Sequence, residues 1–182
     1  MEERKQTESV SLRLDSKTWN KIKLFAKKQK VSPNALVGQI LDCHIEWEVN
    51  SVAAGWIVMP KPFLVELFKL IDKGKIEKTI SDLSTHMAKD MNLYMRGKHD
   101  LESWLSILRA RAQRSGFNLT EYDDERVHEI VMQHDMGENW SRYFKIFYQN
   151  VFDDLGVGTE FDYTDNTLVI KINKNSEFAW HK

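Results

Sequence analysis

Apolar and polar residues alternate along residues 8–15, near the start of the chain. The apolar positions are Val10, Leu12 and Leu14, and the polar positions between them are Ser9, Ser11 and Arg13. A period of two residues is typical of a β-strand with one buried face. We therefore expect a strand here, with the serines and the arginine on its exposed face.

Two helical patterns follow this segment. In the first, which Asp15 or Ser16 can cap, apolar residues share one face and lysines lie elsewhere. The apolar residues are Trp19, Ile22, Phe25 and Ala26, and the lysines are Lys17, Lys21, Lys23, Lys27 and Lys28. In the second, Ser32 is an N-cap and Pro33 takes the first helical position. Its apolar residues are Leu36, Val37, Ile40, Leu41 and Ile45.

A lone strand with two short helices cannot bury its apolar faces by itself. Two copies can do so if their strands pair antiparallel across a two-fold axis, so we expect a homodimer or a higher homo-oligomer. The order strand, helix, helix over residues 7–47 resembles the ribbon-helix-helix family of DNA-binding proteins, the Arc and methionine-repressor type. The resemblance implies a dimeric β-ribbon that enters the major groove of double-stranded DNA.

The resemblance also implies which residues contact DNA. The outward strand positions correspond to the family's base-contacting residues: Ser9, Ser11 and Arg13. The start of the second helix corresponds to the family's phosphate anchor. Together with the basic first helix, it gives as predicted phosphate contacts Lys17, Lys21, Lys28, Lys30, Ser32 and Asn34. The chain departs from the family at Lys30, where glycine is common. The alternative is a module that only dimerises and leaves the polar face of its strand exposed.

The charges are distributed unevenly along the 182 residues, although the formal net charge is only −1. Residues 1–40 contain nine Lys and Arg against four Asp and Glu, whereas residues 121–165 contain three against twelve. This asymmetry is typical of a protein whose N-terminal part alone meets a polyanion, with ordinary solvated surfaces as the alternative. Residues 1–7 are polar and are expected to form a flexible arm.

A boundary between two domains is marked by Gly55, Pro60 and Pro62, because these residues interrupt regular structure. We place a DNA-binding and dimerisation domain at residues 1–50 and a second domain at residues 60–182. Residues 56–59 are too apolar for a free linker, so we expect this segment to pack on the second domain.

The second domain is predicted to be α+β, with helices first and then an antiparallel sheet. Helices are expected over about 63–74, 75–95 and, from an Asp100 cap to Gly116, 101–116. Strands are expected over 117–121, 127–132, 159–164 and 167–173, with a helix after Gly137 between the two hairpins.

Three groups of residues suggest further chemistry, and each has a simpler explanation. His128, His134 and Asp135 lie close in sequence, but they and the single cysteine, Cys43, do not make up a metal-ligand set, so a polar turn is expected. The acidic residues within 121–125 are expected at a hairpin tip, and the aromatic residues within 140–148 have the spacing of a helical core. Phosphate-binding and catalytic motifs are missing from the sequence. We expect no metal, no cofactor and no catalytic residue.

We therefore expect a sequence-specific double-stranded DNA-binding protein, a transcriptional regulator such as a repressor, that is not an enzyme. A single cysteine, the lack of a membrane-length apolar run and a charged start favour the cytoplasm over a membrane or secreted location. The second domain would sense a small-molecule effector or mediate assembly. The alternative function is a non-enzymatic interaction module, an antitoxin-like partner with a dimerisation head.

Overall fold

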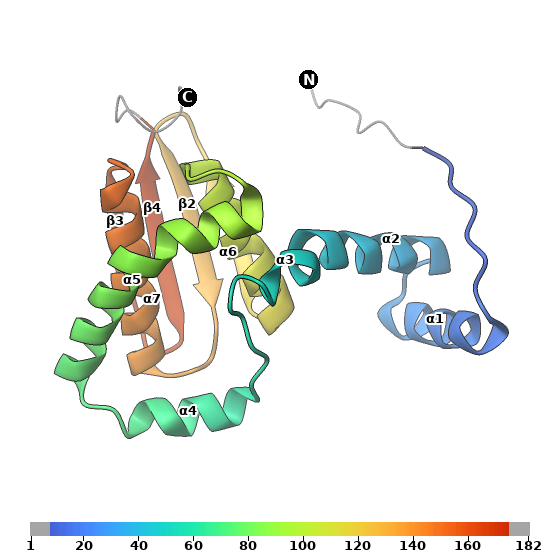
Figure 1. The fold of residues 1–182 in the computed structure, drawn as a ribbon, viewed down its shortest axis with the longest axis horizontal. Helices are drawn as coiled ribbons and strands as arrows, with labels where there is room; N and C mark the ends of the chain where they lie inside the picture. Colours follow the sequence, from blue (N-terminus) through green and yellow to red (C-terminus); the bar gives the residue numbers. More distant parts are fainter. Residues whose placement is uncertain (1–7, 175–182) are drawn as a thin grey trace. The chain divides into compact units, whose positions relative to one another are not determined.

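The computed structural model describes residues 8–174 and, of Lys73, the backbone alone. The chain divides into two compact units, Met1–Asp42 and Cys43–Lys182. Figure 1 shows the elements of both units along the chain. The expected arm of residues 1–7 lies outside the described residues.

The predicted β-strand over residues 8–15 is wrong, and with it the fold class that began with a β-ribbon. These residues have no regular secondary structure, and two helices are the first elements of the described residues. Val10, Leu12 and Leu14 are 77%, 57% and 45% exposed. Backbone N–H and C=O groups of a strand need a neighbouring strand as a partner, and no described segment pairs with residues 8–15. The alternation of apolar and polar residues fits the two faces of a strand, but it does not provide the neighbouring strand that a β-strand needs.

The first unit contains α1 (Ser16–Gln29) and α2 (Pro33–Cys43), whose last residue is the first of the second unit. The side chain of Asp15 caps α1 by accepting from the Thr18 N–H at 2.9 Å. Lys30 ends α1 in the left-handed region, with φ 57° and ψ 36°. The next N–H, that of Val31, donates to the Ala26 carbonyl at 3.0 Å, as in a Schellman cap. A lysine thus adopts here a backbone conformation that glycine favours.

The second unit is built from short helical segments, three longer helices and one sheet. The helical segments are η1 (His44–Glu48, a π-helix), α3 (Val49–Ser51), α4 (Lys61–Lys69), α5 (Lys73–Arg96), α6 (Leu101–Ser115) and α7 (Glu138–Asp154). The strands are β1 (Asn118–Asp123), β2 (Val127–Gln133), β3 (Thr159–Tyr163) and β4 (Thr167–Asn173). The predicted succession of helices, hairpin, helix and hairpin is confirmed for this part of the chain.

The sheet is antiparallel throughout, in the order β1-β2-β4-β3. Its centre is the pair of β2 and β4, where Ile130 lies opposite Ile170. Helices α6 and α7 pack against the sheet, and α5 packs on both of them (Figure 1). The alternating inward residues of β4, which are Leu168, Ile170 and Ile172, have no exposed surface.

Local signals place the ends of α6 as the sequence predicts. The Asp100 side chain accepts from the Ser103 N–H at 2.8 Å, and Gly116 ends the helix with φ 67°. The hydrogen bonds from Ser103 lower the pKa of the Asp100 carboxyl below its ordinary value.

The segment around the predicted domain boundary lies within the second unit. Trp47 is buried in the core of that unit, and Trp56 packs against the same core. Their ring centroids are 4.9 Å apart. The expected packing of residues 56–59 is therefore confirmed for Trp56, whereas Ile57 and Val58 are exposed. Independent folding of residues 1–50 and 60–182 stays a prediction. Across residues 8–174, no helix has both the length and the apolar character needed to cross a membrane.

Candidate nucleic-acid interface

A cationic face runs along α1. An α-helix turns by about 100° per residue, so Lys17, Lys21 and Lys28 fall within about 40° of one another around the axis. All three are exposed. The more buried residues of the helix, Trp19 and Ala26, lie on the opposite side. The face is not purely cationic, because Leu24 shares it and is 54% exposed.

Few acidic groups oppose this face within the first unit. Residues 8–42 contain seven Lys and Arg against three Asp and Glu. Of the acids, Asp15 is occupied in capping α1. None of the lysines on the cationic face forms an ion pair with a carboxylate of the described chain. Lysines without an ion-pair partner attract the phosphates of a nucleic acid, and the strength of that attraction depends on salt.

The turn between the helices brings three more predicted phosphate contacts together. Ser32 caps α2 as expected, because its Oγ accepts from the Ala35 N–H at 3.1 Å. Pro33 has no N–H, which leaves the backbone amide of Asn34 as a donor in the first turn of α2. No acidic residue lies in that turn. Lys30 is exposed just before it, so the turn offers donors and positive charge to an anion.

The predicted base-contacting residues are less organised. Ser9, Ser11 and Arg13 are exposed on the irregular segment before α1. No strand holds them in register, and within residues 8–174 their side chains have no hydrogen-bond or ion-pair partner. The structure therefore groups the predicted phosphate contacts on α1 and at the α1–α2 turn, and leaves the three base contacts on an unpaired segment.

A groove of about 720 Å³ lies within the first unit, between the irregular segment and the helices. Its apolar lining consists of Val10, Leu12, Leu14, Trp19, Val37 and Leu41. Gly38 also lines it, and a Cβ built on this residue would meet no atom within 4 Å. Glycine inside a helix costs about 1 kcal/mol relative to alanine, and no contact in the described chain requires a glycine at this position.

The two histidines considered as metal ligands are hydrogen-bonded separately. His128 lies 2.8 Å from Glu121 and 3.1 Å from Asp123, while the buried His134 bonds Ser141. The described residues hold no group of three or more His, Cys, Asp or Glu side chains placed to bind a metal. His134 is expected at a polar turn, and it does lie in the turn after β2, but its side chain is fully buried.

The acidic residues of the first hairpin are also engaged. Arg109 binds Glu121 through two hydrogen bonds of 2.8 and 2.9 Å. These bonds lower the pKa of the Glu121 carboxyl. The expectation of a solvated turn is therefore wrong for Glu121, which lies on β1 and faces α6. The expectation of a solvated turn fits Asp124 better, because this exposed side chain accepts hydrogen bonds from two backbone amides of the turn.

No family model matches this chain, and no curated protein matches it either.

The buried cation Arg111 is not among the site residues that the sequence predicts. Arg111 of α6 is only 9% exposed and lies among aromatic rings of other elements. Its signal in the sequence is an arginine seven residues after Trp104 and three after Leu108, on the apolar stripe of a helix. Charged residues are rarely buried in this way without an ion-pair partner, and none of the described carboxylates pairs with Arg111.

Proposed function

We propose that the protein binds double-stranded DNA through its first unit and acts as a transcriptional regulator. The observation that supports this most is the cationic face of α1, formed by Lys17, Lys21 and Lys28 without ion-pair partners in the described chain. These lysines would contact phosphates and supply affinity that does not depend on sequence. Lys30, Ser32 and Asn34 at the following turn would fix the position of the unit on the DNA backbone.

Sequence discrimination is assigned to Arg13, with Ser9 and Ser11 as weaker contributors. The planar guanidinium of arginine can donate two hydrogen bonds to a guanine edge in the major groove. The Arg13 side chain has no hydrogen-bond or ion-pair partner among the described residues, so binding guanine would break no such contact. The segment that bears it has no regular secondary structure, so Arg13 would reach the guanine edge from a stretch of backbone that pairs with no described strand.

The proposal includes a homodimer. The apolar groove of the first unit exposes Leu12, Leu14 and Leu41 to solvent. A second copy would remove this surface from water, at roughly 25 cal/mol per Å² of apolar area buried. Gly38 supports close approach of a partner, because it lines the groove and has open space where a side chain would begin. A two-fold dimer would bind two half-sites of a palindromic duplex.

The same groove supports a second candidate, an interaction module whose partner is a different protein. Such a module would use the apolar surface and have no need of the cationic face. The two candidates therefore differ in what they predict for DNA. We prefer DNA binding because three lysines of α1, Lys17, Lys21 and Lys28, lie on the side opposite Trp19, which lines the groove.

The proposal assigns no catalytic role, and a DNA-binding regulator with a single cysteine fits the cytoplasm. The deciding experiment is selection of bound sequences by the full-length protein from random duplex DNA, followed by salt titration of the winning duplex. We expect a palindromic consensus and an affinity that falls steeply as salt rises. Failure to retain any duplex at low salt would reject DNA binding and leave the interaction module.

A further inference from the structure

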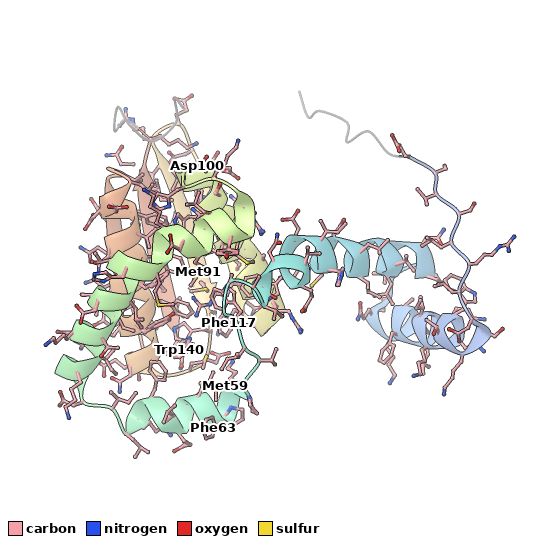
Figure 2. The ribbon with its side chains drawn as sticks, viewed as in Figure 1. Met59, Phe63, Met91, Asp100, Phe117 and Trp140 are labelled. Atoms are coloured by element: carbon pink, nitrogen blue, oxygen red, sulfur yellow. The ribbon has the colours of Figure 1, made fainter. Side chains whose placement is uncertain are left out.

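The second unit contains a cavity of about 540 Å³ that none of the preceding assignments uses. Its walls come from η1, α3 and the segment after it, the start of α4, the end of α6 and the first turn of α7. Figure 2 labels three of its lining residues, Met59, Phe117 and Trp140, in the same part of this unit. A volume of this size lies within the roughly 300–1,000 Å³ that is usual for small-molecule sites.

The polar group that distinguishes this cavity is the guanidinium of Arg111. Its central carbon lies 4.8 Å from the centroid of the Trp56 ring and 4.7 Å from that of Phe144. The Tyr143 ring centroid is 5.6 Å away. One nitrogen of the guanidinium donates to the Tyr143 hydroxyl at 3.3 Å. Arginine stays charged under all ordinary conditions, so a permanent cation is buried among aromatic rings.

This cation has no carboxylate partner in residues 8–174. The one acidic residue that lines the cavity, Glu48, is paired with Arg114 at 2.6 Å. Lys61, also in the lining, adds a further positive charge, and its Nζ lies 5.5 Å from the centroid of the Phe117 ring. The aromatic faces offset part of the cost of burying Arg111, but a buried charge without a counter-ion remains unfavourable.

Two further donors along the cavity lack partners. The indole nitrogens of Trp56 and Trp140 are buried and form no hydrogen bond with any described group. Trp140 as a whole is only 8% exposed. Buried donors are nearly always satisfied in folded proteins, so an unpaired one calls for an explanation such as a missing ligand. Both tryptophans and Arg111, a cation without a carboxylate partner in residues 8–174, line the same cavity.

We propose that this cavity binds a small organic anion, an apolar molecule that bears one carboxylate or a similar acidic group. Arg111 would be its charge partner, and the apolar body would lie against Met59, Leu64 and Phe117. The exposed Ile57 and Val58 line the same cavity, so a bound apolar body would also remove their side chains from water. The cavity belongs entirely to the second unit, so the inference stands whether or not the first unit binds DNA. If it does, the anion is the effector of the regulator.

The test uses the full-length protein and matched pairs of probes that differ only in charge. Octanoate is compared with octanamide, and phenylacetate with phenylacetamide, by isothermal titration calorimetry. A charge-assisted hydrogen bond in a buried site predicts that each carboxylate binds at least about tenfold more tightly than its amide. Equal affinity of acid and amide, or no saturable binding of either acid in the millimolar range, would overturn the proposal.

Two variants assign the effect to the cavity. Arg111→Met removes the cation but keeps a side chain of similar length, and it is expected to abolish the preference for the acid while leaving the amide affinity unchanged. Arg109→Met is the matched control, because Arg109 lies on the same helix but pairs with Glu121 and does not line the cavity. This control should retain the preference. If Arg111→Met keeps it, the anion binds elsewhere and the proposal is rejected.

If the Arg111→Met variant does not fold, the Arg111→Lys variant is used to test the role of Arg111 in its place. It keeps the charge as a point donor and is expected to preserve the preference at reduced strength. Loss of the preference for octanoate over octanamide in the Arg109→Met control would contradict the assignment to Arg111, whatever the behaviour of the other variants.

Discussion

The Nε2 atom of His134 lies 2.8 Å from the hydroxyl oxygen of Ser141, and this pair joins the turn after β2 to α7 inside the core. The same hydroxyl donates its only proton to the Thr164 carbonyl at 2.6 Å. His134 must therefore donate from Nε2. Its Nδ1 accepts from the Met136 N–H at 3.1 Å. One ring nitrogen donates and the other accepts, which is the pattern of a neutral imidazole.

This arrangement predicts that the fold loses stability in mildly acidic solution. Burial lowers the pKa of His134 to about 4, from an ordinary value of 6.5. A histidine whose pKa falls on folding contributes fully above 6.5 and progressively less as the pH drops toward 4. Between pH 7 and pH 5 the free energy of unfolding is expected to fall by about 2 kcal/mol, measured by urea denaturation. Carboxylates with lowered pKa values stay ionised in that range.

His134→Gln should lower stability at pH 7 and flatten the dependence between pH 7 and pH 5. His86→Gln is the control, because His86 is exposed on α5 and bonds only the Asp82 carbonyl of its own helix. An unchanged slope in His134→Gln would show that another group titrates.

Lys30→Gly is expected to stabilise the first unit. Lys30 occupies the left-handed region at the end of α1, where a side chain costs about 1 kcal/mol that glycine avoids. Protection of the α1 amides in hydrogen exchange should rise accordingly. Lys28→Gly removes the same charge two residues earlier, inside the helix, and should lower protection by about 1 kcal/mol. If both variants lowered protection, the left-handed cap would be the wrong description of Lys30.

How far the sequence predicts this fold depends on whether the determining contacts are local. Helix α6 is predicted end to end, because its Asp100 cap and its Gly116 terminator act within a few residues of the helix. The segment of residues 8–15 fails for the opposite reason. Alternating side chains specify two faces, but a strand also needs a partner whose presence no local pattern reveals.

The same distinction explains the candidate sites. The Ser32 cap and the lysine face of α1 follow from spacing alone, and both appear as expected. The environment of Arg111 does not follow from spacing, because its aromatic neighbours come from the segment after α3 and from α7. His134 is predicted at a turn, yet its burial depends on Ser141, which reaches it only after α7 packs on the sheet. Distant segments supply these surroundings, so a scan along the chain does not find them.

Leu12→Asp is expected to convert the protein from dimer to monomer. Leu12 lines the groove of the first unit and is 57% exposed there. In the isolated chain the new carboxylate would remain solvated, so folding should be unaffected, whereas a second copy seated on the groove would bury it at a cost of several kcal/mol. Light scattering of full-length protein measures the change.

Leu70→Asp is the matched control for this experiment. Leu70 lies in the second unit, is 83% exposed and does not line the groove. The control should remain dimeric. A monomeric unaltered protein, or a Leu12→Asp variant that is still dimeric, would remove the homodimer from the proposal.

Arg13 and Lys21 are expected to affect DNA binding in different ways. A guanidinium that donates two bonds to guanine is worth about 1–3 kcal/mol of discrimination, so Arg13→Ala should weaken the selected duplex by about tenfold or more and a scrambled duplex much less. Lys21 lies on the cationic face and reaches only phosphate. Lys21→Ala should weaken both duplexes alike and reduce the salt slope by about 1.

Lys23→Ala supplies the control that ties these effects to one face of α1. Lys23 is exposed, like Lys21, but lies about 160° away around the helix axis, so its removal changes the net charge equally without touching the proposed contact. It should leave the salt slope unchanged on both duplexes. Equal losses for Lys21→Ala and Lys23→Ala would mean that general charge, and not the cationic face, attracts DNA. Equal losses of both duplexes in Arg13→Ala would reduce Arg13 to a phosphate contact, and sequence discrimination would have to come from another part of the chain.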